Sequence, residues 1–334
     1  MIQNWMLEAK AQCRARIRRL TILLGAVASV ILLPVQELHA QHTDYILGSA
    51  GLLSGQQAPP GVYYQNQPSY YWAGNSTTGP FGRLNASTNL DLFIDLNTIG
   101  WTTPWTLFGA HYGMQMTVPL VNTNGSLDLR SQFFNPAVQE RFGFNRSTSN
   151  DQFGFSSIYV EPVNFGWHEP RYDVVTSFGF FAPAGDYNPR RAVNTGLGRW
   201  SEMFSLGGIA YFDQERKWSL STMGRFLIHQ SQQGVDLTVG DDATLEWGLG
   251  RSFKTSIGQV DVGIDGYAYW QVSDTTGSVV PPRFQGRRGS TYALGPEIAA
   301  TTKFGRYFVR FFSEFGGSNT PQGNQITLGG FLLF

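Results

Sequence analysis

The feature that most constrains this chain is a repeated alternation of apolar and polar side chains with a period of two. In residues 89–97, leucine or isoleucine occupies every second position, and aspartate and asparagine fill most of the others. A period of two predicts β-strands. Segments of this kind recur through the chain at residues 60–73, 86–97, 106–121, 151–167, 172–183, 199–212, 218–230, 243–253, 258–273, 290–302, 306–316 and 324–334.

The connections between these twelve segments are alternately short and long. The short ones cover residues 98–105, 168–171, 213–217, 254–257 and 303–305, and the clearest long ones cover 122–150, 184–198 and 273–289. A soluble β-sandwich also alternates between an inner and an outer face, but it has no reason to gather its long loops at one end. An even number of strands with this loop pattern is typical of outer-membrane barrels. Residues 60–334 are therefore predicted to form an all-β, transmembrane, antiparallel up-and-down β-barrel of about twelve strands, with short periplasmic turns and long outer loops.

Residues 1–40 differ from the rest of the chain. Lys10 and four arginines precede an apolar run of about 16 residues, and Ala40 supplies a small residue for cleavage. A membrane-spanning helix needs about 20 apolar residues, so this run favours a cleavable secretory signal over an anchor. The sequence therefore predicts export, cleavage between Ala40 and Gln41, and a location in the outer membrane.

The exported chain has a composition that excludes several classes of function. Removal of residues 1–40 takes away five basic and two acidic residues and leaves a net charge of −3, without a basic tract for nucleic acid. Cys13 is the single cysteine and leaves with the signal, so disulfides are excluded. The sequence has no G-x-S-x-G, H-E-x-x-H, Walker A or dinucleotide-binding pattern. We expect no enzyme activity, no metal and no cofactor.

The alternation also predicts which residues face the lumen. If the apolar faces meet lipid, Leu92 and its alternate neighbours point outward and the polar faces point inward. Two interpretations of the inward residues stay open: a lattice of ion pairs that braces the barrel, or groups that line a substrate path. The expected lumen residues are Asp91, Asp95, His111, Gln115, Glu161, Asp173, Arg225, His229, Glu246, Asp261, Asp265, Glu297, Arg306, Arg310 and Glu314.

Residues 41–59 precede the first strand and contain small and apolar side chains. They either plug the lumen or form a periplasmic tail, because chain ends are often loose. The plug candidates are Leu47, Leu52, Leu53, Pro59 and Pro60.

Several landmarks, taken in order, resemble a known family. They are the motif at residues 58–64 (APPGVYY), residues 155–167 around Glu161-Pro162, residues 181–187 (FAPAGDY) and residues 292–297 (YALGPE). Together they resemble the outer-membrane transporter family associated with the meta pathway of phenol degradation. That family is distantly similar to fatty-acid and aromatic-hydrocarbon channels, and the resemblance implies passage of hydrophobic small molecules.

The function expected from these observations is passive uptake of hydrophobic, aromatic small molecules through a narrow barrel. A general porin, or a structural barrel without a dedicated substrate, is the alternative. The expected partners are outer-membrane lipid, the hydrophobic substrate and the barrel-assembly machinery, because a final strand that ends in Phe334 resembles the signal by which bacterial barrels are recognised. Prolines and glycines in strands, such as Pro162 and Gly329, weaken ladder pairing and leave a side opening as a further hypothesis.

Overall fold

The computed structural model describes residues 43–78, 84–135, 140–189, 191, 194–256, 258–280 and 285–334. The expected signal peptide (residues 1–40, with its cleavage after Ala40) and Gln41 lie outside the described residues. No helix among the described residues is long and apolar enough to cross a membrane.

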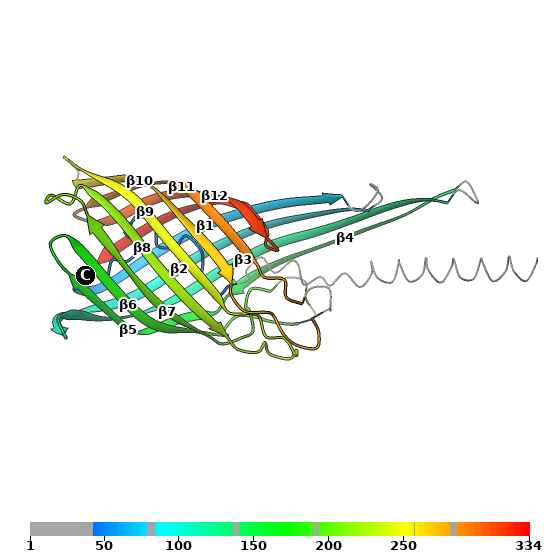
Figure 1. The fold of residues 1–334 in the computed structure, drawn as a ribbon, viewed down its shortest axis with the longest axis horizontal. Helices are drawn as coiled ribbons and strands as arrows, with labels where there is room; N and C mark the ends of the chain where they lie inside the picture. Colours follow the sequence, from blue (N-terminus) through cyan, green and yellow to red (C-terminus); the bar gives the residue numbers. More distant parts are fainter. Residues whose placement is uncertain are drawn as a thin grey trace, which may run out of the picture. The chain divides into compact units, whose positions relative to one another are not determined.

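The described chain is built from antiparallel strands that follow one another around a barrel (Figure 1). A short 3-10 helix, η2 (Gly51–Leu53), precedes the first strand. The strands are β1 (Gly61–Thr78), β2 (Leu84–Leu107), β3 (Ala110–Asn135), β4 (Glu140–Phe155), β5 (Ile158–His168), β6 (Tyr172–Ala182), β7 (Ser201–Tyr211), β8 (Trp218–His229), β9 (Asp242–Thr255), β10 (Gly258–Gln271), β11 (Ser290–Thr302), β12 (Gly305–Ser318) and β13 (Gly323–Leu333).

The sheet closes on itself, because β1 pairs with β2 on one side and with the last strand, β13, on the other. β4 and β5 both pair with β3 and are separated by Ser156 and Ser157. The Ser156 amide still bonds to the carbonyl of Pro119 on β3 (3.1 Å), so β4 and β5 act as one interrupted strand. The thirteen segments thus make the twelve-stranded barrel that the sequence predicts.

Four of the five short connections lie where the sequence places them, and the first does not. Residues 98–105 belong to β2, and the turn is made by Phe108 and Gly109 with φ angles of 54° and 79°. Positive φ at both central residues is what a two-residue type I′ hairpin turn requires. Residues 122–150 were expected to be a loop, but residues 122–135 and 140–150 continue the ladder between β3 and β4. We call the end of the barrel with the short connections the turn end and the opposite end the loop end.

Asp213 organises the short turn before β8. Its carboxylate accepts hydrogen bonds from the backbone N–H groups of Lys217 (3.0 Å) and Trp218 (2.8 Å). These two hydrogen bonds favour the ionised form and hold the pKa of Asp213 below its usual value. This turn, with its charged side chains, lies at the end of the barrel and outside its apolar band.

The outer face of most strands is apolar. Exposed side chains on β10 to β13 include Val262, Ile298, Val309 and Leu328, while their sequence neighbours turn inward. An outward apolar band around a closed barrel is the surface of an outer-membrane protein, which confirms the location expected from the sequence.

The expected facing of β2 is wrong. Leu90, Leu92, Ile94 and Leu96 are 4–8% exposed and point into the barrel. Register explains the reversal, because these residues lie opposite Ala73, Tyr71, Ser69 and Gln67, the inward residues of β1. β2 therefore has an apolar inner face, unlike the polar inner face typical of porins.

Asp91 and Asp95 accordingly lie on the outer face of β2 and do not line the lumen. Asp91 accepts a hydrogen bond from the hydroxyl of Tyr70 (3.0 Å), and Asp95 accepts one from the amide of Asn66 (2.6 Å). Neighbouring side chains on the outer surface thus satisfy these two carboxylates. Leu92→Arg would place a charge inside the barrel rather than in lipid.

Candidate functional site

The N-terminal segment, residues 43–60, runs through the interior of the barrel from one end to the other. At the loop end, Asp44 contacts Arg199, just before β7 (3.1 Å between Oδ2 and Nε). At the turn end, the amide of Gln57 donates to the side chain of Asn164 on β5 (2.8 Å) and to the carbonyl of His111 on β3 (3.1 Å). The segment therefore occupies the space through which a molecule crossing the barrel must pass.

A buried cluster, which we call the Asp44 clasp, holds the segment at the loop end. Its members are Asp44, Arg199, Ser201, His229 and Asp242, and each is at most 7% exposed. Ser201 donates to Asp44 (2.8 Å), and the His229 ring lies between the carboxylates of Asp44 (3.4 Å) and Asp242 (2.8 Å). Removal of one partner from such a cluster leaves an uncompensated buried charge, so the clasp ties the segment to β7, β8 and β9.

Ser201, His229 and Asp242 have the residue types of a hydrolase triad, with 2.8 Å from Ser201 Oγ to His229 Nδ1 and 2.8 Å from His229 Nε2 to Asp242 Oδ2. The surroundings differ from those of a free nucleophile. The carboxylate of Asp44 also lies 2.8 Å from Ser201 Oγ and competes with His229 for the single hydroxyl hydrogen. Ser201 is also fully buried and lines neither hollow described below.

Glu246 on β9 holds the next part of the segment through both of its carboxylate oxygens. Oε1 accepts hydrogen bonds from the amide of Gly48 (2.7 Å) and the hydroxyl of Tyr45 (2.9 Å), and Oε2 accepts one from the amide of Ala50 (3.2 Å). The guanidinium of Arg225 stacks over the Tyr45 ring at 4.1 Å. Expected lumen residues thus bind backbone groups of the N-terminal segment.

Glu297 on β11 and Arg310 on β12 hold the segment at η2. Glu297 accepts a hydrogen bond from the amide of Leu52 (3.1 Å), and Arg310 pairs with Glu297 (2.7 Å) and donates to the carbonyl of Gly48 (2.5 Å). Gly51 has a φ angle of 63°, and a Cβ there would lie 1.8 Å from Nη2 of Arg310. Only glycine fits at this point of the segment.

The structure places the other expected lumen residues on the inner face, where most of the charged ones pair with each other. Those at most 5% exposed are Glu161, Asp173, His229, Glu246, Asp261, Asp265, Glu297 and Arg310. His111, Gln115, Arg225, Arg306 and Glu314 are partly buried on the same face. The pairs on the β8–β12 wall include Arg225–Glu246 (3.3 Å), Arg310–Asp265 (3.0 Å) and Arg306–Asp261, besides the Arg310–Glu297 pair.

The plug candidates divide along the segment. Leu52 is 2% exposed, and Leu47 packs against the buried clusters that contain Tyr45 and Phe312. Leu53 is partly buried, whereas Pro59 and Pro60 are exposed at the turn end. The sequence reasoning missed Asp44, Arg199 and Asp242, although Asp44 is the one acidic residue of the sequence between positions 41 and 60 and could have drawn attention.

Part of the wall formed by β2 and β3 is apolar, in contrast to the charged wall of β8–β12. Leu92, Ile94, Leu96 and Val121 form a buried cluster, and Ile46 of the N-terminal segment packs against it. We call this surface the apolar wall.

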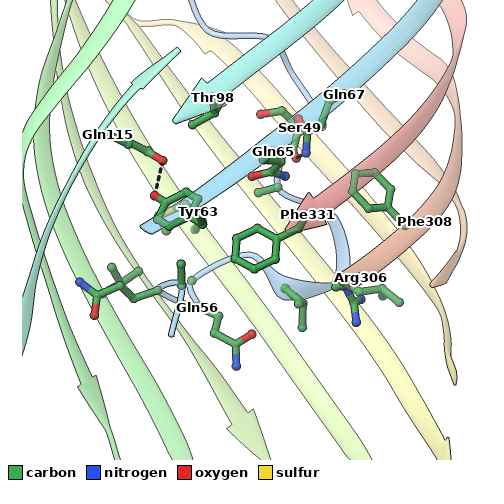
Figure 2. A pocket seen from close by; sticks show the side chains of 18 of the residues that line it. Ser49, Gln56, Tyr63, Gln65, Gln67, Thr98, Gln115, Arg306, Phe308 and Phe331 are labelled. Carbon is green, nitrogen blue, oxygen red and sulfur yellow. Dashed lines mark hydrogen bonds between the residues drawn. The ribbon is translucent and has the colours of Figure 1, made fainter. Parts of the chain in front are cut away.

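Two hollows remain between the N-terminal segment and the barrel. The larger, shown from close by in Figure 2, has a volume of about 930 Å³. It reaches the turn end, where Lys303 and Phe304 line it. The smaller, about 80 Å³, lies toward the loop end and is lined by Leu92, Ile94 and Glu314, among others. Ile46 lines both hollows, so the N-terminal segment separates them along the apolar wall.

No curated protein matches the sequence significantly. Among solved structures, an outer-membrane channel from Pseudomonas putida F1 aligns with a TM-score of 0.61 at 12% identity and covers 87% of this chain and 100% of its own. The β domain of the Bordetella autotransporter BrkA aligns with a TM-score of 0.46 at 12% identity and covers 83% of this chain and 100% of its own. The monoaromatic hydrocarbon channel CymD aligns with a TM-score of 0.37 at 8% identity and covers 83% of this chain and 90% of its own. At these identities the likeness to the Pseudomonas channel is one of fold.

A family profile gives the stronger relationship. Its match covers residues 72–328, which include three of the four landmarks found in the sequence and confirm the resemblance. The chain belongs to the family described as "Putative MetA-pathway of phenol degradation".

Proposed function

We propose that this protein is an outer-membrane channel that admits hydrophobic, aromatic small molecules along its apolar wall. The observation that carries the proposal is the inward stripe of Leu90, Leu92, Ile94 and Leu96, which reaches both hollows: Leu96 lines the larger, and Leu92 and Ile94 line the smaller. An apolar molecule gains about 25 cal/mol for each Å² removed from water, so a lining of this kind favours it over an ion. Family membership and the barrel fold agree with this function.

In this proposal the N-terminal segment is the gate. Ile46 fills the apolar wall between the two hollows, so cargo passes only when this part of the segment moves aside. The Asp44 clasp and the bonds to Glu246 and Glu297 set the resting position. The sequence carries no nucleotide-binding motif, and transport would follow the concentration gradient.

Two further parts of the proposal concern biogenesis. We propose that residues 1–40 are removed as a signal peptide and that the barrel-assembly machinery recognises β13 through Phe334. The Phe334 amide donates to the carbonyl of Val62 (2.8 Å), so the last residue continues the β13–β1 pairing at the turn end.

The test is the substitution Ile94→Gln, which places an unpartnered amide in the apolar wall. We expect uptake of labelled naphthalene by a porin-deficient Gram-negative strain to fall by roughly tenfold, because an unsatisfied polar group on the path is costly to pass and to solvate. The matched control is Ile209→Gln, since Ile209 is also a buried isoleucine (2% exposed) but lines neither hollow.

Heat-modifiable migration in gels verifies that equal amounts of both variants are folded. Equal uptake by the two variants would contradict the assignment of the apolar wall as the path.

A further inference from the structure

One side chain of the larger hollow stands apart from its neighbours. Gln65 points inward from β1, between its Cα partners Thr98 on β2 and Phe331 on β13. Figure 2 shows its amide facing the same space as the rings of Tyr63, Phe331 and Phe308. The Tyr63 and Phe331 rings lie 5.3 Å apart, so aromatic surface flanks the amide.

The neighbouring glutamines of this hollow use their amides within the protein, and Gln65 does not. Gln67 donates to the carbonyl of Ser49 (3.1 Å). Gln115 accepts from Tyr63 (2.9 Å) and donates to Glu161 (3.1 Å). Within the described part of the chain the Gln65 amide has no hydrogen-bond partner, although it is partly buried. It therefore presents one acceptor and two donors to whatever enters.

Two ionised side chains of the hollow, Arg306 and Glu161, are already bound within the protein. Arg306 pairs with Asp261, and Glu161 accepts hydrogen bonds from Tyr159 (2.7 Å) and Asn164 (2.8 Å) as well as from Gln115. Neither of them offers a free counter-charge to an ionised substituent at Gln65, which favours a neutral one there. The aromatic rings provide the complementary surface for an aromatic body, which packs well in offset or edge-on geometry.

We propose that Gln65 is a specificity-determining residue that binds the polar group of aromatic cargo carrying one neutral hydrogen-bonding substituent, such as a hydroxyl. Tyr63, Phe308 and Phe331 contact the ring, and the Gln65 amide exchanges a hydrogen bond with the substituent. This inference rests on the proposed function, since it names the class of molecule that the same channel prefers.

The test compares 2-naphthol with 2-methylnaphthalene, which differ by a hydroxyl in place of a methyl group. Uptake of each labelled compound is measured in a porin-deficient Gram-negative strain that expresses the full-length protein or a variant. Gln65→Leu removes the amide and keeps the volume. We expect it to lower 2-naphthol uptake by about 3–10-fold, which corresponds to the net free energy of one hydrogen bond. Uptake of 2-methylnaphthalene should stay within about twofold of the wild-type rate.

The control is Gln259→Leu, which removes another glutamine of the same hollow whose amide is already bound to Asp261 (2.8 Å). We expect it to leave the ratio of the two uptake rates unchanged. An unchanged ratio in folded Gln65→Leu would overturn the assignment of Gln65 alone. If cells with the wild-type protein take up neither compound faster than cells with an empty vector, the proposed function fails and the inference fails with it.

Discussion

Deletion of residues 43–56 is expected to convert a nearly silent barrel into an open pore, with single-channel conductance in a planar bilayer rising on the order of tenfold or more. The physical reason is space. A barrel of twelve strands is wider than the eight-stranded barrels whose side chains fill the interior, so an empty lumen of this size conducts ions. In the intact protein, residues 43–60 occupy that lumen and bind β3, β5, β8, β9, β11 and β12.

A second variant tests the same point without shortening the chain. Gly51→Val places a side chain where even a Cβ would lie 1.8 Å from Arg310 and 2.1 Å from Glu297, so η2 must leave its site. We expect it to raise conductance as well. Steady conductance in the intact protein, unchanged by either alteration, would instead support a general porin.

Arg310→Met is expected to destabilise the folded barrel by about 3–5 kcal/mol, because it leaves buried carboxylates without their cation. Arg310 is 2% exposed and lies 2.7 Å from Glu297 and 3.0 Å from Asp265. The measurement is the free energy of unfolding in urea after refolding into lipid.

The matched control is Arg288→Met, which removes an exposed arginine 2.8 Å from Asp274 in a loop. An exposed pair contributes about 0–1 kcal/mol, so this variant should unfold close to wild type. Equal losses in the two variants would show that the charged wall has no structural role.

The barrel could be predicted from the sequence because two observations combine: the alternation predicts β-strands, and the gathering of long loops at one end favours an outer-membrane barrel over a soluble sandwich. Which face of β2 points into the barrel could not be predicted from the sequence. Alternation separates two faces but does not state which one is inside, and on β2 the usual assignment fails. Contacts with other elements decide which face is inside. Within the barrel, Ile46 packs against the cluster of Leu92 and Ile94. On the outer face, Asn66 and Tyr70 donate hydrogen bonds to Asp95 and Asp91, respectively.

The Asp44 clasp was beyond sequence reasoning for a different reason. Its five members come from the N-terminal segment, the start of β7, the end of β8 and the start of β9, up to 198 positions apart, and no spacing rule joins them. His229 alone was expected in the lumen. The extent of β2 and β3 was also underestimated, since residues 98–105 and 122–135 contain the small and polar residues that usually mark turns.

The central claim is that cargo passes only when the N-terminal segment moves, and a reversible lock tests it most directly. Asp44 and Ser201 are in hydrogen-bond contact (2.8 Å), and the only cysteine, Cys13, lies in the expected signal peptide. Cysteines at both positions (D44C and S201C) can then form a single disulfide in the exported protein, whose formation is followed by mass spectrometry. With the disulfide formed we expect uptake of naphthalene to stop, and with dithiothreitol we expect it to return to at least the wild-type rate. Uptake that proceeds equally in the oxidised and reduced protein would contradict the account.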